Sequence, residues 1–225
     1  MKNVPEHIGI ILDGNRRFAQ KIILKPWKGH ELGARKVEEF FDWCVDLGLK
    51  EVTLYSFSTE NFNRDRKEVD FLMKLFKQEF GRIKDDPRLM KNKIRIKFVG
   101  LRERFDKDIQ KLMAEIEKKT SKNKRIVFNF AMAYGGRTEI VEAVKTIIKN
   151  KKQINEKNIE KYLWVNSDVD LIIRTGGDIR TSNFLMWQSA YSELIFLDKL
   201  WPEFEKQDLV NCIEEFLRRE RRFGK

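Results

Sequence analysis

The stretch His7-Ile8-Gly9-Ile10-Ile11-Leu12-Asp13 decides the fold class, because it is a short and nearly continuous apolar run that ends in a carboxylate. Such a run is typical of a strand buried on both faces of a sheet. Similar runs follow it, and stretches with the 3.6-residue period of amphipathic helices lie between most of them. The further predicted strands are 51–57, 94–99, 125–130, 171–174 and 194–197, and the predicted helices are 37–44, 69–80, 105–116, 140–148 and 209–216.

Alternating strands and helices need crossover connections, which join parallel strands. We therefore expect an α/β fold, with a single domain over residues 1–225 in which a mostly parallel central sheet is flanked by helices. Ligands of such sheets bind beyond the carboxyl ends of the strands, so the residues directly after each strand are the candidates for function.

The composition excludes several classes of protein. Of the 225 residues 41% are hydrophobic, which is enough for a core and excludes wholesale disorder. No apolar run reaches the roughly 18 residues of a membrane span, and the first apolar run is shorter than a signal peptide requires. Cys44 and Cys212 lie far apart in the sequence, which argues against a disulfide framework or a zinc cluster. We expect a cytoplasmic protein.

The formal net charge of +11 favours an anionic partner, such as nucleic acid, a phosphorylated substrate or an acidic membrane surface. The same charge fits a solvated surface rich in lysine and glutamate. Charge alone does not choose between these interpretations.

The first predicted strand is followed by Asp13-Gly14-Asn15-Arg16-Arg17. Gly14 permits close backbone approach, and a short helix after it would offer unpaired N–H groups to an anion. Asp13 would face that anion, which is favourable only with a divalent cation between them. Mg²⁺ suits such a site, because it takes oxygen ligands and keeps several of its waters. Alternatively, Asp13 caps the helix, and the spacing leaves both interpretations open.

Two other predicted strands also end in polar segments. The segment from Ser56 to Arg64 carries more hydroxyl, amide and charged groups than a capping loop needs, which favours a function. Strand 171–174 ends in Arg174, and a glycine pair, Arg180 and Ser182 follow it. Guanidinium groups can bind phosphate oxygens bidentately, and we expect the glycines to turn their N–H groups inward as an anion-binding nest. A surface turn is the alternative.

Glu193 and His30 have open roles. A carboxylate at Glu193, beside an apolar strand, needs a partner, so it pairs with an arginine or joins Asp13 on Mg²⁺. His30 stands at the start of a helix-like stretch, where a histidine is structural or donates to phosphate. The sequence contains no phosphate-binding GxxxxGK[ST] loop, no GxGxxG fingerprint and no Ser/His/Asp order, which argues against nucleoside-triphosphate chemistry and acyl transfer.

Together these segments resemble the cis-prenyltransferase family, that is, undecaprenyl diphosphate synthase and its relatives, from His7 to Gly224. The motifs stand in the family's order. They are 13–17 (DGNRR), 29–30 (GH), 55–61 (YSFSTEN), 134–137 (YGGR), 170–177 (DLIIRTGG), 182–185 (SNFL) and 191–194 (YSEL).

The resemblance implies a homodimer that elongates an allylic prenyl diphosphate with isopentenyl diphosphate units, with Mg²⁺ as cofactor. It implies a catalytic and metal-binding Asp13, with Glu193 contributing to the metal site, through a partner molecule or a diphosphate-bound water. It implies Asn61 beside the condensation site, as a participant in proton removal. The substrate-binding residues that it implies are Gly14, Asn15, Arg16, Arg17 and His30; Ser58, Thr59, Glu60, Asn61, Phe62 and Arg64; and Arg174, Arg180 and Ser182.

Within this set, the resemblance assigns Gly14, Asn15, Arg17 and His30 to the allylic diphosphate and Arg174, Arg180 and Ser182 to isopentenyl diphosphate. The growing chain needs a dry apolar tunnel, because each five-carbon unit removed from water is worth about 4 kcal/mol. Candidate walls are Phe57, Phe71, Leu72, Phe76, Phe98, Phe128 and Phe130, and the alternative for most of them is a place in the ordinary core. The closing segment 218–224 matches a tail that lies near the dimer interface and active site in relatives.

Two positions depart from the bacterial pattern, with Pro26 in place of an arginine and Ile179 in place of a histidine. These departures and the lysine-rich composition favour an archaeal-type member, which suggests geranylgeranyl rather than farnesyl diphosphate as primer. Product length is not readable from the sequence, and a lipid product leaves open a peripheral membrane contact for its release.

Two rival functions are less consistent with the sequence. A nucleic-acid-binding module predicts exposed aromatic residues among lysines and arginines, whereas these aromatics fall at core spacing. A non-catalytic partner subunit is expected to lack Asp13 or the Arg174 segment, and both are present. We therefore expect no nucleic-acid partner.

Overall fold

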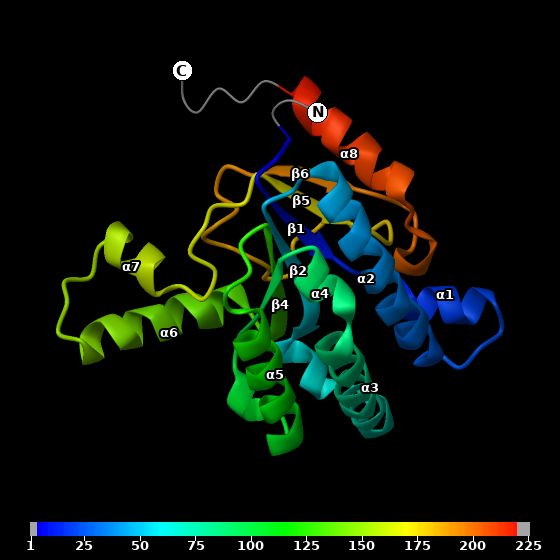
Figure 1. The fold of residues 1–225 in the computed structure, drawn as a ribbon, viewed down its shortest axis with the longest axis horizontal. Helices are drawn as coiled ribbons and strands as arrows, with labels where there is room; N and C mark the ends of the chain where they lie inside the picture. Colours follow the sequence, from blue (N-terminus) through cyan, green and yellow to red (C-terminus); the bar gives the residue numbers. More distant parts are fainter. Residues whose placement is uncertain (1–3, 220–225) are drawn as a thin grey trace.

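The fold is built on a six-stranded sheet in the order β3-β4-β2-β1-β5-β6, with every neighbouring pair parallel (Figure 1). The computed structural model describes residues 4–219. The strands are β1 His7–Ile11, β2 Glu51–Ser58, β3 Ile94–Val99, β4 Ile126–Tyr134, β5 Leu171–Arg174 and β6 Glu193–Phe196. The mostly parallel sheet predicted from the sequence is thus confirmed.

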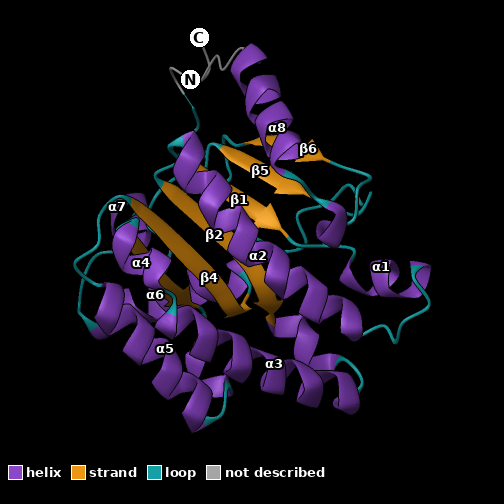
Figure 2. Ribbon diagram, turned by 45° about the vertical axis from the view of Figure 1, so that its right-hand side comes forward, coloured by secondary structure: helices purple, strands orange, loops and turns teal. Residues whose placement is uncertain are grey.

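Helices connect the strands except β5 and β6, which a segment of turns joins, and α2 crosses one face of the sheet (Figure 2). The α-helices are α1 Asn15–Lys21, α2 Lys28–Leu47, α3 Arg66–Asp85, α4 Pro87–Lys91, α5 Lys107–Thr120, α6 Gly136–Lys149, α7 Glu156–Tyr162 and α8 Lys206–Arg218. Short 3₁₀ helices are η1 Thr59–Asn63, η2 Arg102–Arg104 and η3 Trp201–Glu203. The predicted long helices are confirmed, whereas α4 and α7 are not recognisable from periodicity.

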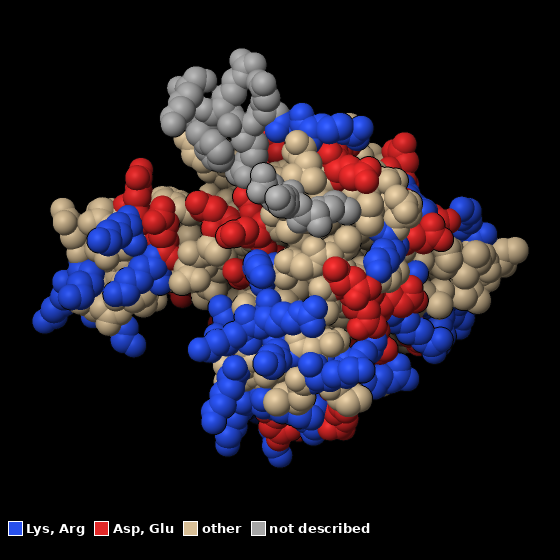
Figure 3. Space-filling view, turned by 45° about the horizontal axis from the view of Figure 1, so that its top comes forward, with Lys and Arg blue, Asp and Glu red and all other residues tan. Residues whose placement is uncertain are grey.

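The surplus of positive charge is largely spread among negative charges. On the face shown in Figure 3, aspartate and glutamate side chains lie among lysine and arginine side chains in the upper half, and lysine and arginine predominate in the lower half. Ion pairs such as Lys206 with Asp46 at 2.7 Å and Lys36 with Glu39 at 2.8 Å join them. Exposed pairs of this kind contribute little to stability, so much of the charge serves as a solvated surface.

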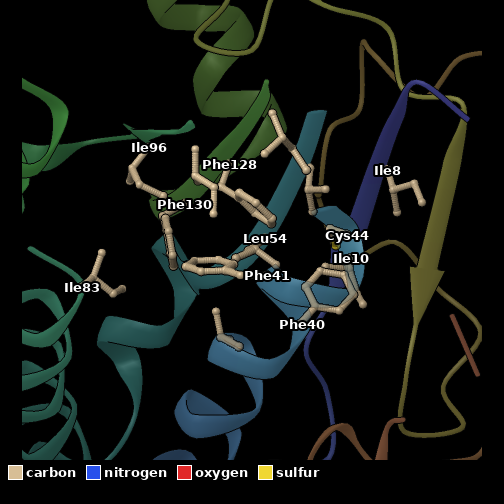
Figure 4. Packing of buried hydrophobic residues seen from close by; sticks show 14 of the residues in the cluster. Ile8, Ile10, Phe40, Phe41, Cys44, Leu54, Ile83, Ile96, Phe128 and Phe130 are labelled. Atoms are coloured by element: carbon tan, nitrogen blue, oxygen red, sulfur yellow. The ribbon is translucent and has the colours of Figure 1, made fainter. Parts of the chain in front are cut away.

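The main apolar core lies between the sheet and α2, α3, α5 and α8. In Figure 4, Phe41 of α2 lies against Phe128 of β4, with their ring centroids 4.3 Å apart. A smaller cluster covers the other face of the sheet and includes Phe184 and Leu185 from the segment before β6. Gly9 of β1 makes this contact possible, because a Cβ there would lie 3.1 Å from the Phe184 ring.

A buried histidine joins three segments at the amino edge of the sheet. His7 Nε2 is 2.8 Å from the Thr53 hydroxyl on β2, and His7 Nδ1 is 3.0 Å from the Asp168 carbonyl oxygen. Burial lowers the pKa of His7 and outweighs the nearby charge of Glu51, which acts in the opposite direction. The folded state therefore holds His7 neutral at pH values where an unfolded chain, with a histidine pKa near 6.5, begins to bind a proton.

We predict that His7 makes the free energy of unfolding fall as the pH drops below about 6.5, because the unfolded state then binds more protons than the folded state. The contribution of one such group is at most about 1.4 kcal/mol per pH unit. Urea denaturation between pH 7 and pH 5 should give a shallower slope for His7→Gln than for the wild type. Equal slopes would show that His7 titrates normally in the folded protein.

Candidate active site

The predicted site residues converge at the carboxyl edge of the sheet. β1 lies between β2 and β5, and Ile11 is in register with both Tyr55 and Arg174. Asp13 after β1, Ser58 at the end of β2 and Arg174 at the end of β5 are therefore brought together. The chain leaves β1 toward β2 and leaves β5 toward β6, in opposite directions, so the site lies at a topological switch point.

The Asp13 carboxylate joins the ends of β1 and β5. Its Oδ2 accepts a hydrogen bond of 2.7 Å from Arg174 Nη2. Its Oδ1 accepts one of 2.6 Å from the Gly14 N–H and lies 3.2 Å from Arg17 Nη2. Gly14, with a φ of 104°, is the N-cap of α1, and no side chain caps that helix. The alternative interpretation, in which Asp13 caps the helix, is therefore wrong.

The Asp13 carboxylate is ionised and can serve as a ligand of a divalent cation. Partial burial by itself raises the pKa of Asp13, but the hydrogen bond from Arg174 and the charges of Arg174 and Arg17 outweigh it and lower the pKa. Among residues 4–219 only Arg174 donates to Oδ2, which keeps a lone pair for a metal ion. One carboxylate together with substrate phosphate oxygens fits the ligand preference of Mg²⁺. The described residues contain no cluster of three or more His, Cys, Asp or Glu arranged for a metal.

Arg174 organises the loop that follows β5. It is 3% exposed, and its Nη1 donates to the Arg180 carbonyl oxygen at 2.6 Å and to Ser182 Oγ at 2.8 Å. Asp178 accepts two hydrogen bonds from the Arg180 guanidinium, at 3.1 and 2.8 Å, and lies 3.7 Å from Arg17. The Arg180 side chain is exposed at the rim of the site, so Arg174 holds the loop and Arg180 faces solvent.

The glycine pair after Arg174 does not form the expected anion-binding nest. The N–H groups of Gly176 and Gly177 donate to the backbone carbonyls of Lys199 and Leu197, each at 2.8 Å. Both glycines have positive φ, of 93° and 78°, and a Cβ on Gly176 would lie 2.6 Å from Arg17 Nη2. The prediction of a nest is wrong, because these N–H groups hold the segment after β6 and the glycines make room for Arg17.

A buried carboxylate on α3 gathers three basic groups from other segments. Glu68 Oε1 accepts hydrogen bonds from Arg64 Nη1 at 2.9 Å and pairs with His30 Nε2 at 3.3 Å. Glu68 Oε2 lies 3.5 Å from Arg16. Burial and the charge of Arg64 lower the pKa of His30 to about 4, so this imidazole is neutral at physiological pH.

Two adjoining polar cavities lie on either side of Asp13. The larger, of about 800 Å³, includes the Arg174 loop and the end of β2. The other, of about 540 Å³, runs along α1 and reaches Gln20. Both include Leu12, Asp13, Asn15, His30, Arg64 and Arg180. The predicted residues that line one or both cavities are Asp13, Gly14, Asn15, Arg16, Arg17, His30, Ser58, Glu60, Asn61, Arg64, Arg174, Arg180 and Ser182.

Two predicted residues of the segment after β2 lie outside the lining of these cavities. Phe62 packs instead against Phe57 and Phe105, at centroid distances of 4.8 and 5.8 Å, and Thr59 lies on the same 3₁₀ helix. Asn61 lines the larger cavity, but its Oδ1 accepts a hydrogen bond of 3.0 Å from the Ser58 N–H. Asn61 therefore shapes the loop as well as facing the cavity.

A narrow apolar cavity of about 90 Å³ leads from the polar site between α2, α3 and the sheet. It shares Leu12, Asn15, His30, Ser56 and Leu72 with the larger polar cavity. Of the candidate tunnel walls, Leu72, Phe76 and Phe130 line it. Phe98 and Phe128 are fully buried in the core instead.

Glu193 lies at the opposite edge of the sheet from Asp13. It begins β6 and is in register with Leu171, the first residue of β5, whereas Asp13 follows the end of β1. Arg219 Nη1 donates to Glu193 Oε2 at 2.8 Å. Within one chain, the interpretation that Glu193 and Asp13 share a Mg²⁺ is therefore wrong, and the alternative pairing with an arginine is confirmed. The roles through a partner molecule or through a diphosphate-bound water stay predictions.

Sequence reasoning missed several residues of the site. Glu68 stands on the apolar stripe of α3, four residues before Leu72, and a carboxylate at such a position is a signal for a buried partner. Asp178 was also missed, although it lies between Arg174 and Arg180 in the sequence. Arg137 and Asn183 line the larger cavity, and the Arg137 N–H donates to Asn183 Oδ1 at 2.9 Å. Arg137 belongs to the motif 134–137 and Asn183 to the motif 182–185, but no local sequence pattern assigns either residue a role.

Comparisons with known proteins give the family of the chain. The family model described as "Putative undecaprenyl diphosphate synthase" matches residues 11–224. An undecaprenyl-diphosphate synthase of Pyrococcus furiosus, named as geranylgeranyl-diphosphate specific, is 46% identical over 99% of this chain and 88% of its own length. An isoprenyl transferase of Thermus thermophilus is 43% identical over 99% of this chain and 89% of its own. The chain therefore belongs to the undecaprenyl diphosphate synthase family of cis-prenyltransferases.

Solved structures show the same fold. Lavandulyl diphosphate synthase from Lavandula x intermedia, in complex with dimethylallyl diphosphate, superposes with a TM-score of 0.92 and 31% identity over 99% of both chains. A probable undecaprenyl diphosphate synthase from Campylobacter jejuni superposes with a TM-score of 0.86 and 31% identity over both whole chains.

Two glycines allow α1 to pack closely on α2. A Cβ on Gly29 would lie 1.8 Å from the Asn15 carbonyl oxygen, and one on Gly33 would lie 2.2 Å from Asn15 Oδ1. This contact fixes the helix that carries Arg16 and Arg17 against the helix that carries His30. The backbone contact at Gly29 cannot be relieved by a side-chain movement.

We predict that Gly29→Ala destabilises the protein by about 1–3 kcal/mol, as overpacking of a close contact does, and weakens binding of diphosphate ligands because α1 moves. The matched control is Gly81→Ala on α3, where a Cβ meets nothing within 4 Å. This change should stabilise the protein by about 0.5–1 kcal/mol. Thermal unfolding of both variants checks the prediction, and equal effects of the two changes would contradict it.

Proposed function

We propose that the chain condenses isopentenyl diphosphate with an allylic prenyl diphosphate in cis geometry, to make a long-chain polyprenyl diphosphate of the lipid-carrier type. The observation that carries this proposal is the pair of polar cavities that share Asp13 and connect to an apolar cavity. The reaction needs sites for two charged head groups and for one apolar tail. Residues 1–225 act in this proposal as one catalytic domain.

The cavity along α1 suits the allylic diphosphate. Arg16 and Arg17 are about half exposed there, so their guanidinium groups can turn from Glu68 and Asp13 toward an anion. Gly14 gives the backbone close approach, and His30 lies at the junction with the apolar cavity. This position puts the carbon chain next to the apolar cavity and the diphosphate beside Asp13.

The Arg174 loop suits isopentenyl diphosphate. Arg180 is 59% exposed, and Ser182 is held in place by the buried Arg174 guanidinium. Guanidinium groups bind phosphate oxygens in pairs of parallel hydrogen bonds. Arg180 therefore binds the head group directly, while Arg174 fixes the loop that presents it.

The proposed reaction begins when the allylic carbon–oxygen bond breaks and diphosphate leaves. The arginines around Asp13 stabilise the negative charge that develops on the leaving group. Mg²⁺, held by Asp13 when bound, would supply further neutralisation of that charge. C4 of isopentenyl diphosphate attacks the allylic carbon, and a proton is then lost from C2 to an oxygen of the departed diphosphate. Ser58, Glu60, Asn61 and Arg64 border this region, with Asn61 facing the cavity.

We predict that Asp13→Ala lowers kcat/KM for incorporation of labelled isopentenyl diphosphate by about 10²–10³-fold or more, since it removes the carboxylate that suits Mg²⁺. The matched control is Asp108→Ala, an exposed aspartate on α5 paired with Lys77, which should leave the rate unchanged. Circular dichroism checks that both variants fold. Wild-type turnover in a folded Asp13→Ala protein would overturn the role of Asp13.

The primer is proposed to be geranylgeranyl diphosphate. The support is the 46% identity to the Pyrococcus furiosus enzyme, whose name states that specificity, together with Pro26 and Ile179. We expect kcat/KM to be higher for geranylgeranyl than for farnesyl diphosphate when both are assayed with isopentenyl diphosphate and Mg²⁺. Chromatography of the dephosphorylated products would give the chain length, and a preference for farnesyl diphosphate would contradict this proposal.

We also propose that the enzyme is a cytoplasmic homodimer. The support for a dimer is an exposed apolar stripe on α6. Figure 1 shows that α6 extends, together with α7, away from the sheet. Val141 and Ile148 on this stripe are 50% and 60% exposed. Most of the closing segment 218–224, predicted to lie near the dimer interface, falls outside the described residues 4–219. No helix among residues 4–219 has the length and apolar character needed to cross a bilayer.

A further inference from the structure

The loop between α1 and α2 exposes three consecutive apolar side chains. Ile22, Ile23 and Leu24 are 44%, 94% and 45% exposed. Figures 1 and 2 show this loop projecting from the body of the molecule beside α1. Single exposed apolar residues are ordinary on protein surfaces, but a projecting group of three marks an interaction site.

The backbone holds these side chains in an ordered and strained arrangement. The Leu24 N–H donates to the Ala19 carbonyl oxygen at 2.8 Å, and the Ile23 N–H donates to the Gln20 carbonyl oxygen at 3.1 Å. These two bonds form a Schellman motif at the end of α1, in which glycine is the usual residue at the left-handed position. Ile23 occupies it with a φ of 58°. A β-branched residue there costs free energy, so its side chain reduces the stability of the folded chain.

Basic residues surround this apolar tip. Between Lys21 and Lys28 the sequence has three lysines and no acidic residue. Lys21 and Lys28 flank the loop with side chains 65% and 48% exposed, and each pairs with a carboxylate, Lys21 with Glu203 at 2.6 Å and Lys28 with Glu31 at 2.8 Å. The Lys25 ammonium group lies 5.6 Å from the centre of the half-buried Trp27 ring. Apolar side chains surrounded by lysines, with a tryptophan at their base, match the chemistry of an anionic bilayer surface.

The loop also lies beside the opening of the substrate site. The polar cavity along α1 reaches Gln20, two residues before Ile22. The helices that the loop connects supply Asn15 and His30, which line both the polar and the apolar cavities. A surface that contacted this loop would therefore lie next to the cavity proposed for the allylic substrate.

We propose that Ile22, Ile23 and Leu24 form a membrane anchor that inserts into the interface of an anionic bilayer, with Lys21, Lys25 and Lys28 facing lipid phosphates. The anchor places the site where a lipid product is released into the membrane. This last point rests on the proposed function, whereas the contact with the bilayer does not.

Vesicle sedimentation tests the anchor. The wild type should bind vesicles of phosphatidylcholine with phosphatidylglycerol about tenfold more tightly than vesicles of phosphatidylcholine alone, and added salt should weaken the binding. The triple variant Ile22→Ser, Ile23→Gly, Leu24→Ser should bind at least roughly tenfold more weakly. The matched control is Met90→Ser, which removes an apolar side chain of similar exposure (49%) on α4 and should bind like the wild type.

The single variant Ile23→Gly separates a membrane role from a structural role. It relieves the strained φ, so its melting temperature should stay equal or rise while its vesicle binding falls. Wild-type protein that stays in the supernatant, or a triple variant that binds like the wild type, would overturn the proposal. So would light scattering that shows a dimer for the wild type and a monomer for the triple variant, because the loop would then join two copies of the chain. Turnover in detergent, measured in parallel, tests the proposed function separately from the anchor.

Discussion

The ion pair between Asp13 and Arg174 is the interaction on which the rest of the site depends. It joins the carboxyl ends of two neighbouring parallel strands, and the same guanidinium holds Ser182 and the Arg180 carbonyl oxygen. A guanidinium that is 3% exposed is tolerable only with a carboxylate beside it. The pair therefore fixes the Asp13 carboxylate and the loop that carries Arg180 and Ser182 relative to each other, and it keeps the carboxylate ionised.

The short helix α1 runs from the polar site to an exposed loop. At its start, Arg16 and Arg17 face the polar cavity, and at its end the Schellman motif presents Ile23 to solvent. Gly29 and Gly33 of α2 let this helix pack closely enough to place both ends. A charged site, an apolar cavity and an apolar loop thus lie along one side of the sheet, in an arrangement suited to a substrate with a charged head and a growing apolar tail.

The sequence predicts the sheet well because a strand buried on both faces leaves a continuous apolar run, as at Ile8 to Leu12. It predicts most of the cavity lining because the ends of parallel strands share one edge. The short helices α4 and α7 give too few turns for periodicity. The nest at Gly176 was wrong because the direction of an N–H group depends on its partner, here Lys199 from a distant segment. The sequence did not predict the position of Glu193, since strand order decides which edge it occupies.

The central claim is that one site at the carboxyl edge of the sheet holds both diphosphates beside Asp13. A crystal structure with Mg²⁺, isopentenyl diphosphate and an unreactive thio analogue of the allylic diphosphate tests it most directly. The account predicts one head group against Arg17 and His30, the other against Arg180 and Ser182, and a metal ion between them on Asp13. Head groups bound on separate faces of the molecule, with no ligand near Asp13, would contradict it.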